Sequence, residues 1–148
     1  MATTQLNGPA YSVDADNLFA GPKFPVIVRK LTVNNPQVAL TRGMAVIQAY
    51  DVTEAKDSAG TGTVDVVTYS DDLYIAGDDN SGTAYVGEII GILVEDAAAD
   101  TTNATIDVHA YVCGAFNIAA VSSIDDDKYD VTDDENVYAA LRNGIYLL

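Results

Sequence analysis

Residues 91–117 read GILVEDAAADTTNATIDVHAYVCGAFN, and this stretch decides the fold. It contains the end of an apolar run over residues 85–94, a polar connection over residues 95–103, and a second run over residues 105–112. In the second run hydrophobic and polar residues alternate, which is typical of a strand with one buried face. We therefore expect two strands here, and we place His109 on the polar face of the second.

Toward the amino terminus, the same patterns predict further strands over residues 26–33, 44–50, 63–69 and, as a short continuation, 73–75. In residues 44–50 hydrophobic side chains fall on both faces, so this strand is predicted to be buried on both sides. Two stretches rich in Gly and Asp, residues 57–62 and 77–82, are expected to be loops because these residues tolerate the dihedral angles that turns need.

One helix is predicted near the carboxyl terminus. Thr132 and Glu135 have the spacing of a capping box, in which the Thr hydroxyl and the Glu carboxylate bind backbone N–H groups at the start of a helix. The helix is expected to begin after Thr132 and to have Gly144 at its C-cap. The apolar residues 145–148 are expected to be buried. The predicted fold class is mostly β, a small α+β domain with one short C-terminal helix.

Length and composition indicate the number of domains and exclude one class of partner. With 148 residues, 49% of them hydrophobic, the chain is expected to form a single β-rich domain over residues 25–148. Its 7 Lys and Arg against 22 Asp and Glu give a net charge of −15. Such a field repels a phosphate backbone, so we expect no direct contact with nucleic acid.

The compartment is predicted from three features. The single cysteine, Cys113, excludes an intrachain disulfide and favours a reducing compartment. Residues 1–11 show neither the basic nor the apolar part of a signal peptide. The longest apolar stretch, residues 86–94, is interrupted by Gly and Glu and is too short to span a bilayer. We expect a protein made in the cytoplasm, with no membrane partner.

Residues 1–24 differ from the rest of the chain. They combine small polar residues with two Gly-Pro pairs, at residues 8–9 and 21–22, and proline interrupts regular secondary structure. We predict a flexible, extended amino-terminal arm with scattered apolar anchors; a frayed terminus is the alternative interpretation. The anchors are Leu6, Tyr11, Val13, Leu18 and Phe19.

Few residues are candidates for chemistry. His109 is the only histidine, which excludes a site built from several histidines, and Cys113 is interpreted as a buried, inert thiol. The acid-rich stretches 78–80, 125–127 and 133–135 lack the alternating spacing of a calcium loop, so we interpret them as solvated faces or caps. The sequence contains no phosphate-binding glycine motif, nucleophile elbow or zinc spacing. We expect no catalytic, cofactor or metal site, and predict a protein-binding module rather than an enzyme.

The chain also resembles the head decoration proteins of lambda-type tailed bacteriophages. The similar features are a strand that ends in Gly-Ile-Leu-Val-Glu-Asp (91–96), a polar connection, and an alternating strand that ends in Gly-Ala-Phe-Asn (114–117). Weaker matches lie at residues 42–46 and 141–146, so order and spacing agree across roughly residues 40–148. The motif positions are Gly43, Gly91, Glu95, Gly114, Phe116 and Asn117.

This resemblance implies a β-clip-like, incomplete barrel that forms a homotrimer on the outer surface of an expanded capsid, in the virion. There it would hold the major capsid protein against the pressure of packaged DNA, and the amino-terminal arm would become ordered on docking. The chain departs from the family pattern through insertions at residues 51–62 and 77–82 and through its acidity.

Two other hypotheses stay open. The loop-rich, acidic surface also suits another virion or surface β module, such as a head fibre base or an adhesin-like domain. A small hydrolase would use the adjacent acids Glu95 and Asp96, although adjacent acids at the end of a strand are more often turn residues.

Overall fold

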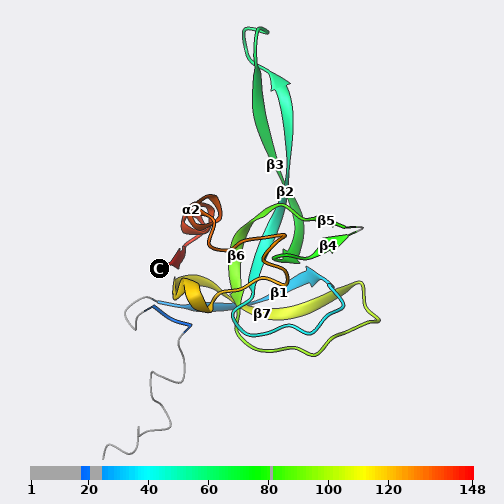
Figure 1. The fold of residues 1–148 in the computed structure, drawn as a ribbon, viewed down its shortest axis with the longest axis vertical. Coiled ribbons are helices and arrows are strands. Elements are labelled where there is room, and N and C mark those ends of the chain that lie inside the picture. The colour runs from blue at the N-terminus through cyan, green and yellow to red at the C-terminus, as the bar shows by residue number, and fades with distance from the viewer. Residues whose placement is uncertain (1–17, 21–24, 81) are drawn as a thin grey trace, which may run out of the picture.

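The structure, a computed structural model, describes residues 18–20, 25–80 and 82–148. Its main feature is one sheet with the strand order β1–β7–β6–β2–β3, in which all neighbours are antiparallel, and β8 adds to β7 in parallel (Figure 1). The mostly-β fold class is therefore confirmed. The strands of this sheet are β1 (Ile27–Asn34), β2 (Ala45–Lys56), β3 (Thr63–Ile75), β6 (Gly87–Leu93), β7 (Thr105–Phe116) and β8 (Ile145–Leu147).

Three smaller elements complete the described chain. A short hairpin pairs β4 (Asp79–Asn80) with β5 (Thr83–Ala84), so part of the predicted loop at residues 77–82 is strand. The short 3-10 helix η3 (Ile118–Ala120) follows β7, and the helix α2 (Asp134–Arg142) precedes β8.

The main sheet is open but curled. Its two edge strands, β1 and β3, contact each other, and Asn34 Nδ2 at the end of β1 donates a hydrogen bond to the Leu73 carbonyl in β3 at 3.3 Å. The curl brings the faces of β1, β2, β3, β6 and β7 around one apolar cluster, made up of Val33, Leu40, Val46, Ile75, Leu93, Val108 and Ala110.

A second apolar cluster lies on the opposite face of the sheet, under α2 and the segment that leads to it. Strand β2 separates the two clusters: Val46 belongs to the first, and Ala45 and Ile47 belong to the second, all with 0% exposure. The prediction of a strand buried on both sides is therefore confirmed for this part of β2. Burial of apolar surface on both faces stabilises the sheet by roughly 25 cal/mol per Å² removed from water.

Strand β7 follows the predicted alternation. Val108 and Ala110 are buried, whereas Asp107 and His109 are exposed. The strand continues past the predicted end to Phe116, because its last residues pair with β8 and pack in the second cluster. By contrast, β6 begins at Gly87 rather than at residue 85, since Tyr85 turns away to stack on Tyr74 at 3.6 Å between ring centroids.

The caps of helix α2 differ from the prediction. The N-cap is Asp133 rather than Thr132, and its carboxylate accepts a hydrogen bond from the Glu135 N–H at 2.9 Å. A carboxylate reaches this donor as well as a hydroxyl does, so the spacing alone does not choose between neighbouring caps. At the other end Asn143 is the C-cap, and Gly144 follows with a φ of +82°, a conformation that favours glycine.

The carboxyl-terminal residues are only partly buried. Ile145 and Leu147 pack in the second cluster, as predicted, whereas Tyr146 and Leu148 are exposed. Strand β8 alternates because one face rests on the core and the other faces out.

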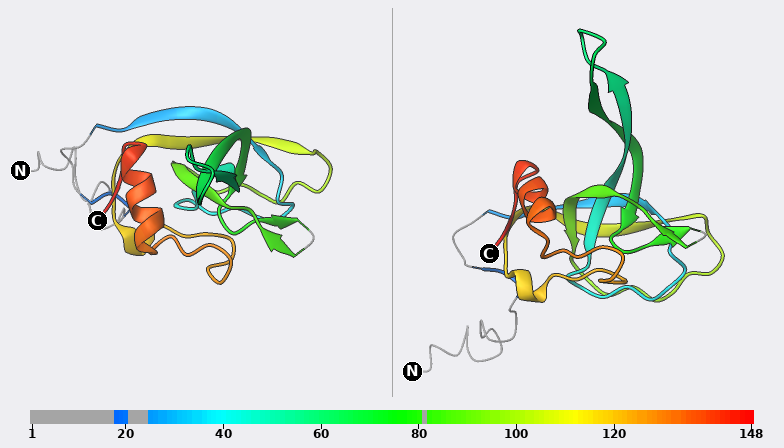
Figure 2. Two further views of the ribbon diagram at one scale, coloured as in Figure 1. Left: turned by 90° about the horizontal axis from the view of Figure 1, so that it is seen from above. Right: turned by 45° about the horizontal axis from the view of Figure 1, so that its top comes forward.

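Strands β2 and β3 form a long hairpin whose outer half projects from the body (Figures 1 and 2). We call this outer half the ribbon: residues 51–56, residues 63–68 and the turn between them. The predicted strand over residues 63–69 and its short continuation over residues 73–75 form one uninterrupted strand, because β3 runs from Thr63 to Ile75. Residues 57–62 form the turn, as predicted, with the Gly60 N–H bonded to the Asp57 carbonyl at 2.9 Å.

Candidate interaction surfaces

The motif glycine Gly43 lies where three segments cross. Its N–H donates to the Leu93 carbonyl at 3.0 Å, and its carbonyl accepts from the Ser122 N–H at 3.1 Å. Its φ is +95°, and a Cβ added here would lie 2.6 Å from the Ala120 carbonyl oxygen. Gly43 is therefore required for backbone packing.

The other motif positions on the strands are also structural. A Cβ at Gly91 would lie 3.1 Å from the Ala110 Cβ, so the glycine lets β6 approach β7 closely. Gly114 has a φ of +146° and would bring a Cβ within 2.9 Å of Val26. Phe116 is fully buried, and Asn117 caps η3 by accepting from the Ala119 N–H. These positions shape the scaffold and expose no reactive group.

Glu95 and Asp96, the acids of the hydrolase hypothesis, make separate contacts. Glu95 Oε1 lies 3.1 Å from His109 Nδ1, with both side chains more than half exposed. Asp96 accepts a hydrogen bond from the Arg42 backbone N–H at 2.8 Å. The first is a surface contact and the second ties two loops together, as expected of turn residues.

The two described anchors of the predicted arm belong to the body of the protein. Leu18 is 2% exposed in the second cluster, and its carbonyl accepts from the Asn117 N–H at 2.7 Å. Phe19 is half-buried and contacts Tyr111 and Phe116, with ring centroids 5.1 and 5.6 Å apart. They therefore fasten the chain to the end of β7 in this structure. The anchors Leu6, Tyr11 and Val13 lie outside the described residues.

Cys113 is half-buried, which corrects the prediction of a buried thiol. It sits at the end of β7 where β1 begins, and its Sγ lies 3.6 Å from the Pro25 carbonyl oxygen. This contact with a carbonyl supplies no base that would activate the thiol.

The acid-rich stretches are engaged with their surroundings. Lys128 pairs with Asp79 and, at 3.6 Å, with Asp125. Asp130, which lies between two of these stretches, accepts a hydrogen bond from the hydroxyl of Thr132, and this holds the pKa of the Asp130 carboxyl below its ordinary value. Within the described residues, no group of three or more His, Cys, Asp or Glu side chains could hold a metal ion.

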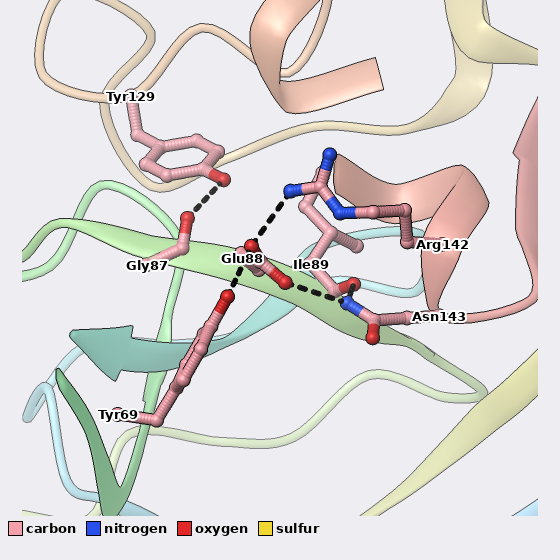
Figure 3. Close-up of polar contacts among 7 residues, drawn as sticks. All are labelled: Tyr69, Gly87, Glu88, Ile89, Tyr129, Arg142 and Asn143. Atoms are coloured by element: carbon pink, nitrogen blue, oxygen red, sulfur yellow. Dashed lines mark hydrogen bonds and ion pairs between the residues drawn. The ribbon is translucent and has the colours of Figure 1, made fainter. Parts of the chain in front are cut away.

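The sequence pattern did not reveal a polar cluster in which exposed side chains surround the buried Glu88 (Figure 3). The Glu88 carboxylate accepts hydrogen bonds from Tyr69 Oη at 2.7 Å, Arg142 at 2.8 Å and Asn143 Nδ2 at 3.3 Å. Asn143 Nδ2 also donates to the Ile89 carbonyl at 3.1 Å. The cluster joins the root of the β2–β3 hairpin, strand β6 and the end of α2.

The electrostatics of the cluster favour a charged Glu88. Burial by itself raises the pKa of Glu88, but the hydrogen bonds from Tyr69, Arg142 and Asn143 outweigh it, so the pKa lies below its ordinary value. The hydrogen bond to Glu88 in turn raises the pKa of Tyr69. A carboxylate that accepts hydrogen bonds from three donors holds the elements of the fold together and is not a free acid or base. The signal in the sequence was a single Glu inside an otherwise apolar strand.

The ribbon presents two different faces. The pairs Val52–Val67 and Glu54–Asp65 lie on one face, continuing outward from Tyr50–Tyr69 at the root. The pairs Thr53–Val66 and Ala55–Val64 lie on the other face. All of residues 51–56 and 63–68 are exposed except Ala55, which is half-buried. The ribbon therefore carries valines and acids that the described body does not cover.

The first half of β1, together with Val26 before it, is a second exposed surface. Residues 26–30 are all exposed and read Val-Ile-Val-Arg-Lys. Strand β1 pairs with β7 along one edge. Along residues 27–31 its other edge has no strand partner within the described chain. Arg29 and Lys30 make this a basic site on an acidic protein.

No family model and no curated protein matches this chain. In the part that the structure describes, none of the helices has the length and apolar character needed to cross a membrane.

Proposed function

We propose that this protein is a structural component of a tailed-phage virion, which binds the outer surface of the expanded capsid as a homotrimer and stabilises it against the pressure of packaged DNA. Its partner in this role is the major capsid protein. The role is non-catalytic and uses no cofactor. The resemblance at residues 91–117 and the arrangement around it support this proposal.

The observation that carries the proposal is the docking of residues 18–20 on the end of β7. The Ala20 N–H donates to the Ala115 carbonyl at 3.0 Å, and the Asn117 N–H donates to the Leu18 carbonyl at 2.7 Å. The chain that precedes Leu18 therefore starts from the end of the motif stretch, on a rigid support. An extended segment fastened in this way can add to a sheet edge of a capsid protein.

The body suits the support of such a segment. Two apolar clusters fill both faces of the sheet, and the Glu88 cluster ties α2 and the hairpin to β6. Residues 18–20 lie at one side of the body, away from the projecting ribbon (Figures 1 and 2). The two regions can therefore make separate contacts.

The test is a truncation that removes residues 2–17 and keeps Leu18 and Phe19. Removal of Leu18 as well would open a cavity in the core, at a cost of about 2–5 kcal/mol, and would confuse folding with binding. We expect the truncated protein to keep its melting temperature and to lose co-sedimentation with expanded capsids, whereas the full chain binds. Equal binding by both proteins would refute the role of this segment.

A head fibre base or adhesin-like module is the second candidate, and the projecting ribbon favours it. Such a module would occupy particular positions on a particle, whereas a decoration protein covers the capsid lattice. Labelling of the protein on intact particles separates the two.

A further inference from the structure

The ribbon lacks the neighbours that a two-stranded sheet needs. A lone hairpin is marginally stable in water, and stability comes from a third strand or from packing against another surface. Val52, Val66 and Val67 are 53%, 40% and 46% exposed, although β-branched side chains at these positions suit a packed sheet. The ribbon thus has the composition of an element that packs against another surface.

The ribbon also contains an electrostatic conflict. Glu54 and Asp65 lie directly opposite each other in the register of β2 and β3. Like charges at paired positions destabilise a sheet. A cation beside Glu54 and Asp65 would remove this repulsion. The ribbon itself has a single basic residue, Lys56.

The first half of β1 has the complementary properties. Ile27 and Val28 are 49% and 47% exposed, beside two adjacent basic residues. Lys30 lies 3.6 Å from Asp107 on the neighbouring strand, and both side chains are more than half exposed. Within the described chain Arg29 makes no ion pair. An unpaired edge with exposed valines is a site for the addition of further strands.

The two surfaces do not meet within one copy, because the ribbon projects away from the body that carries β1 (Figures 1 and 2). A second copy of this chain has the charge and apolar pattern that each of the two surfaces requires of a partner. The chain as a whole is strongly acidic, so copies approach each other most readily where a basic patch meets an acidic one.

We propose that the ribbon of one copy lies along the free edge of β1 of a second copy, with Glu54 and Asp65 beside Arg29 and the ribbon valines against Ile27 and Val28. The two surfaces differ, so the contact is head-to-tail, and such contacts close into a ring when the rotation permits. The inference deepens the homotrimer part of the proposed function by naming its contact. It does not depend on the capsid.

The test uses charge reversal on the two surfaces. The ribbon variant is E54K/D65K, which keeps two like charges opposite each other and so preserves the internal conflict of the ribbon. The strand variant is R29E/K30E. The combined variant carries all four substitutions and restores opposite charges across the contact. The control, D127K/D134K, makes the same change in net charge as the ribbon variant at two exposed acids on other segments.

The readout is the mass of each protein in solution over a range of concentrations, with circular dichroism to confirm folding. We expect the wild type, the control and the combined variant to associate. We expect the ribbon and strand variants to associate at least about tenfold more weakly, and added salt to weaken the wild-type contact.

Three results would overturn the inference: a wild type that stays a single copy throughout, ribbon and strand variants that keep the wild-type mass, or a folded combined variant that stays dissociated. Loss of association in the control would overturn it as well, because net charge would then explain the effect. Capsid co-sedimentation is measured separately, so failure of this contact and failure of the capsid role give different results.

Discussion

Glu88 is a carboxylate in a strand whose neighbours are apolar, and its three donors come from distant parts of the chain. Replacement by Gln keeps the size and removes the charge. We expect E88Q to lower the free energy of unfolding by about 1.5–3 kcal/mol, the usual contribution of hydrogen bonds to a charged group. Urea denaturation at neutral pH measures this, with the exposed Glu135→Gln as the matched control. An equal loss in both variants would contradict a stabilising role for the Glu88 carboxylate.

The same carboxylate makes stability depend on pH. The folded pKa of Glu88 lies below the ordinary value of 4.5, so ionised Glu88 stabilises the fold at higher pH and loses this contribution as pH falls through its folded pKa. E88Q lacks this contribution. We expect the difference in unfolding free energy between wild type and E88Q to narrow as the pH is lowered below about 4.5. A difference that stays constant down to pH 3 would rule out a lowered pKa.

Gly43 and Gly60 provide a matched pair of glycines with positive φ. A Cβ at Gly43 meets the Ala120 carbonyl at 2.6 Å, whereas a Cβ at Gly60 meets no heavy atom within 4 Å. We expect G60A to cost about 1 kcal/mol from backbone strain, and G43A to cost about 3 kcal/mol or more because the steric conflict is added. Thermal or urea unfolding distinguishes them. Equal costs would mean that glycine is required at position 43 only for its positive φ and not for the close approach of Ala120.

At the scale of the elements, the cap of α2 can be tested directly. The Asp133 carboxylate accepts from the Glu135 N–H, whereas the Thr132 hydroxyl donates to Asp130 at 2.6 Å. We expect D133A to lower the unfolding free energy by about 1 kcal/mol, and T132A to change it by no more than about 0.5 kcal/mol. The reverse order in urea denaturation would restore Thr132 as the cap.

The ribbon is an element that the body does not need. No residue of 51–56 or 63–68 belongs to either apolar cluster. A trimmed protein in which Asn-Gly replaces residues 53–66 joins the paired residues Val52 and Val67 by a two-residue turn. We expect the unfolding free energy of a single trimmed copy to stay within about 1 kcal/mol of that of the dissociated strand variant R29E/K30E. A trimmed protein that fails to fold would show that the ribbon supports the body.

At the level of the whole molecule, the alternation of residues predicted correctly which side chains of a strand are buried, because this feature depends on neighbours along the chain. The faces of β7 followed from Asp107 and His109 against Val108 and Ala110, and the two-sided burial of β2 followed from Ala45, Val46 and Ile47. These residues repeat at the period of a strand, so their pattern contains the burial.

Features that depend on contacts between residues far apart in the sequence could not be predicted in this way. Arg142 and Asn143 lie 54 and 55 residues from Glu88, and no spacing links them. Leu18 falls between two Gly-Pro pairs and looks like part of an arm, yet its contacts with the end of β7 bury it. Residues 63–68 of the ribbon were predicted as strand from their alternation, but residues 51–56 lack a buried face and so resembled an insertion with no regular structure. In each case tertiary contacts prevail over local pattern.

We propose that the protein covers the capsid of a phage particle. The direct measurement is its copy number in purified virions, by quantitative mass spectrometry relative to the major capsid protein. We predict a copy number comparable with that of the capsid protein. Absence from the virion would contradict the structural role, and a few copies per particle would contradict the decoration of the lattice in favour of a fibre base.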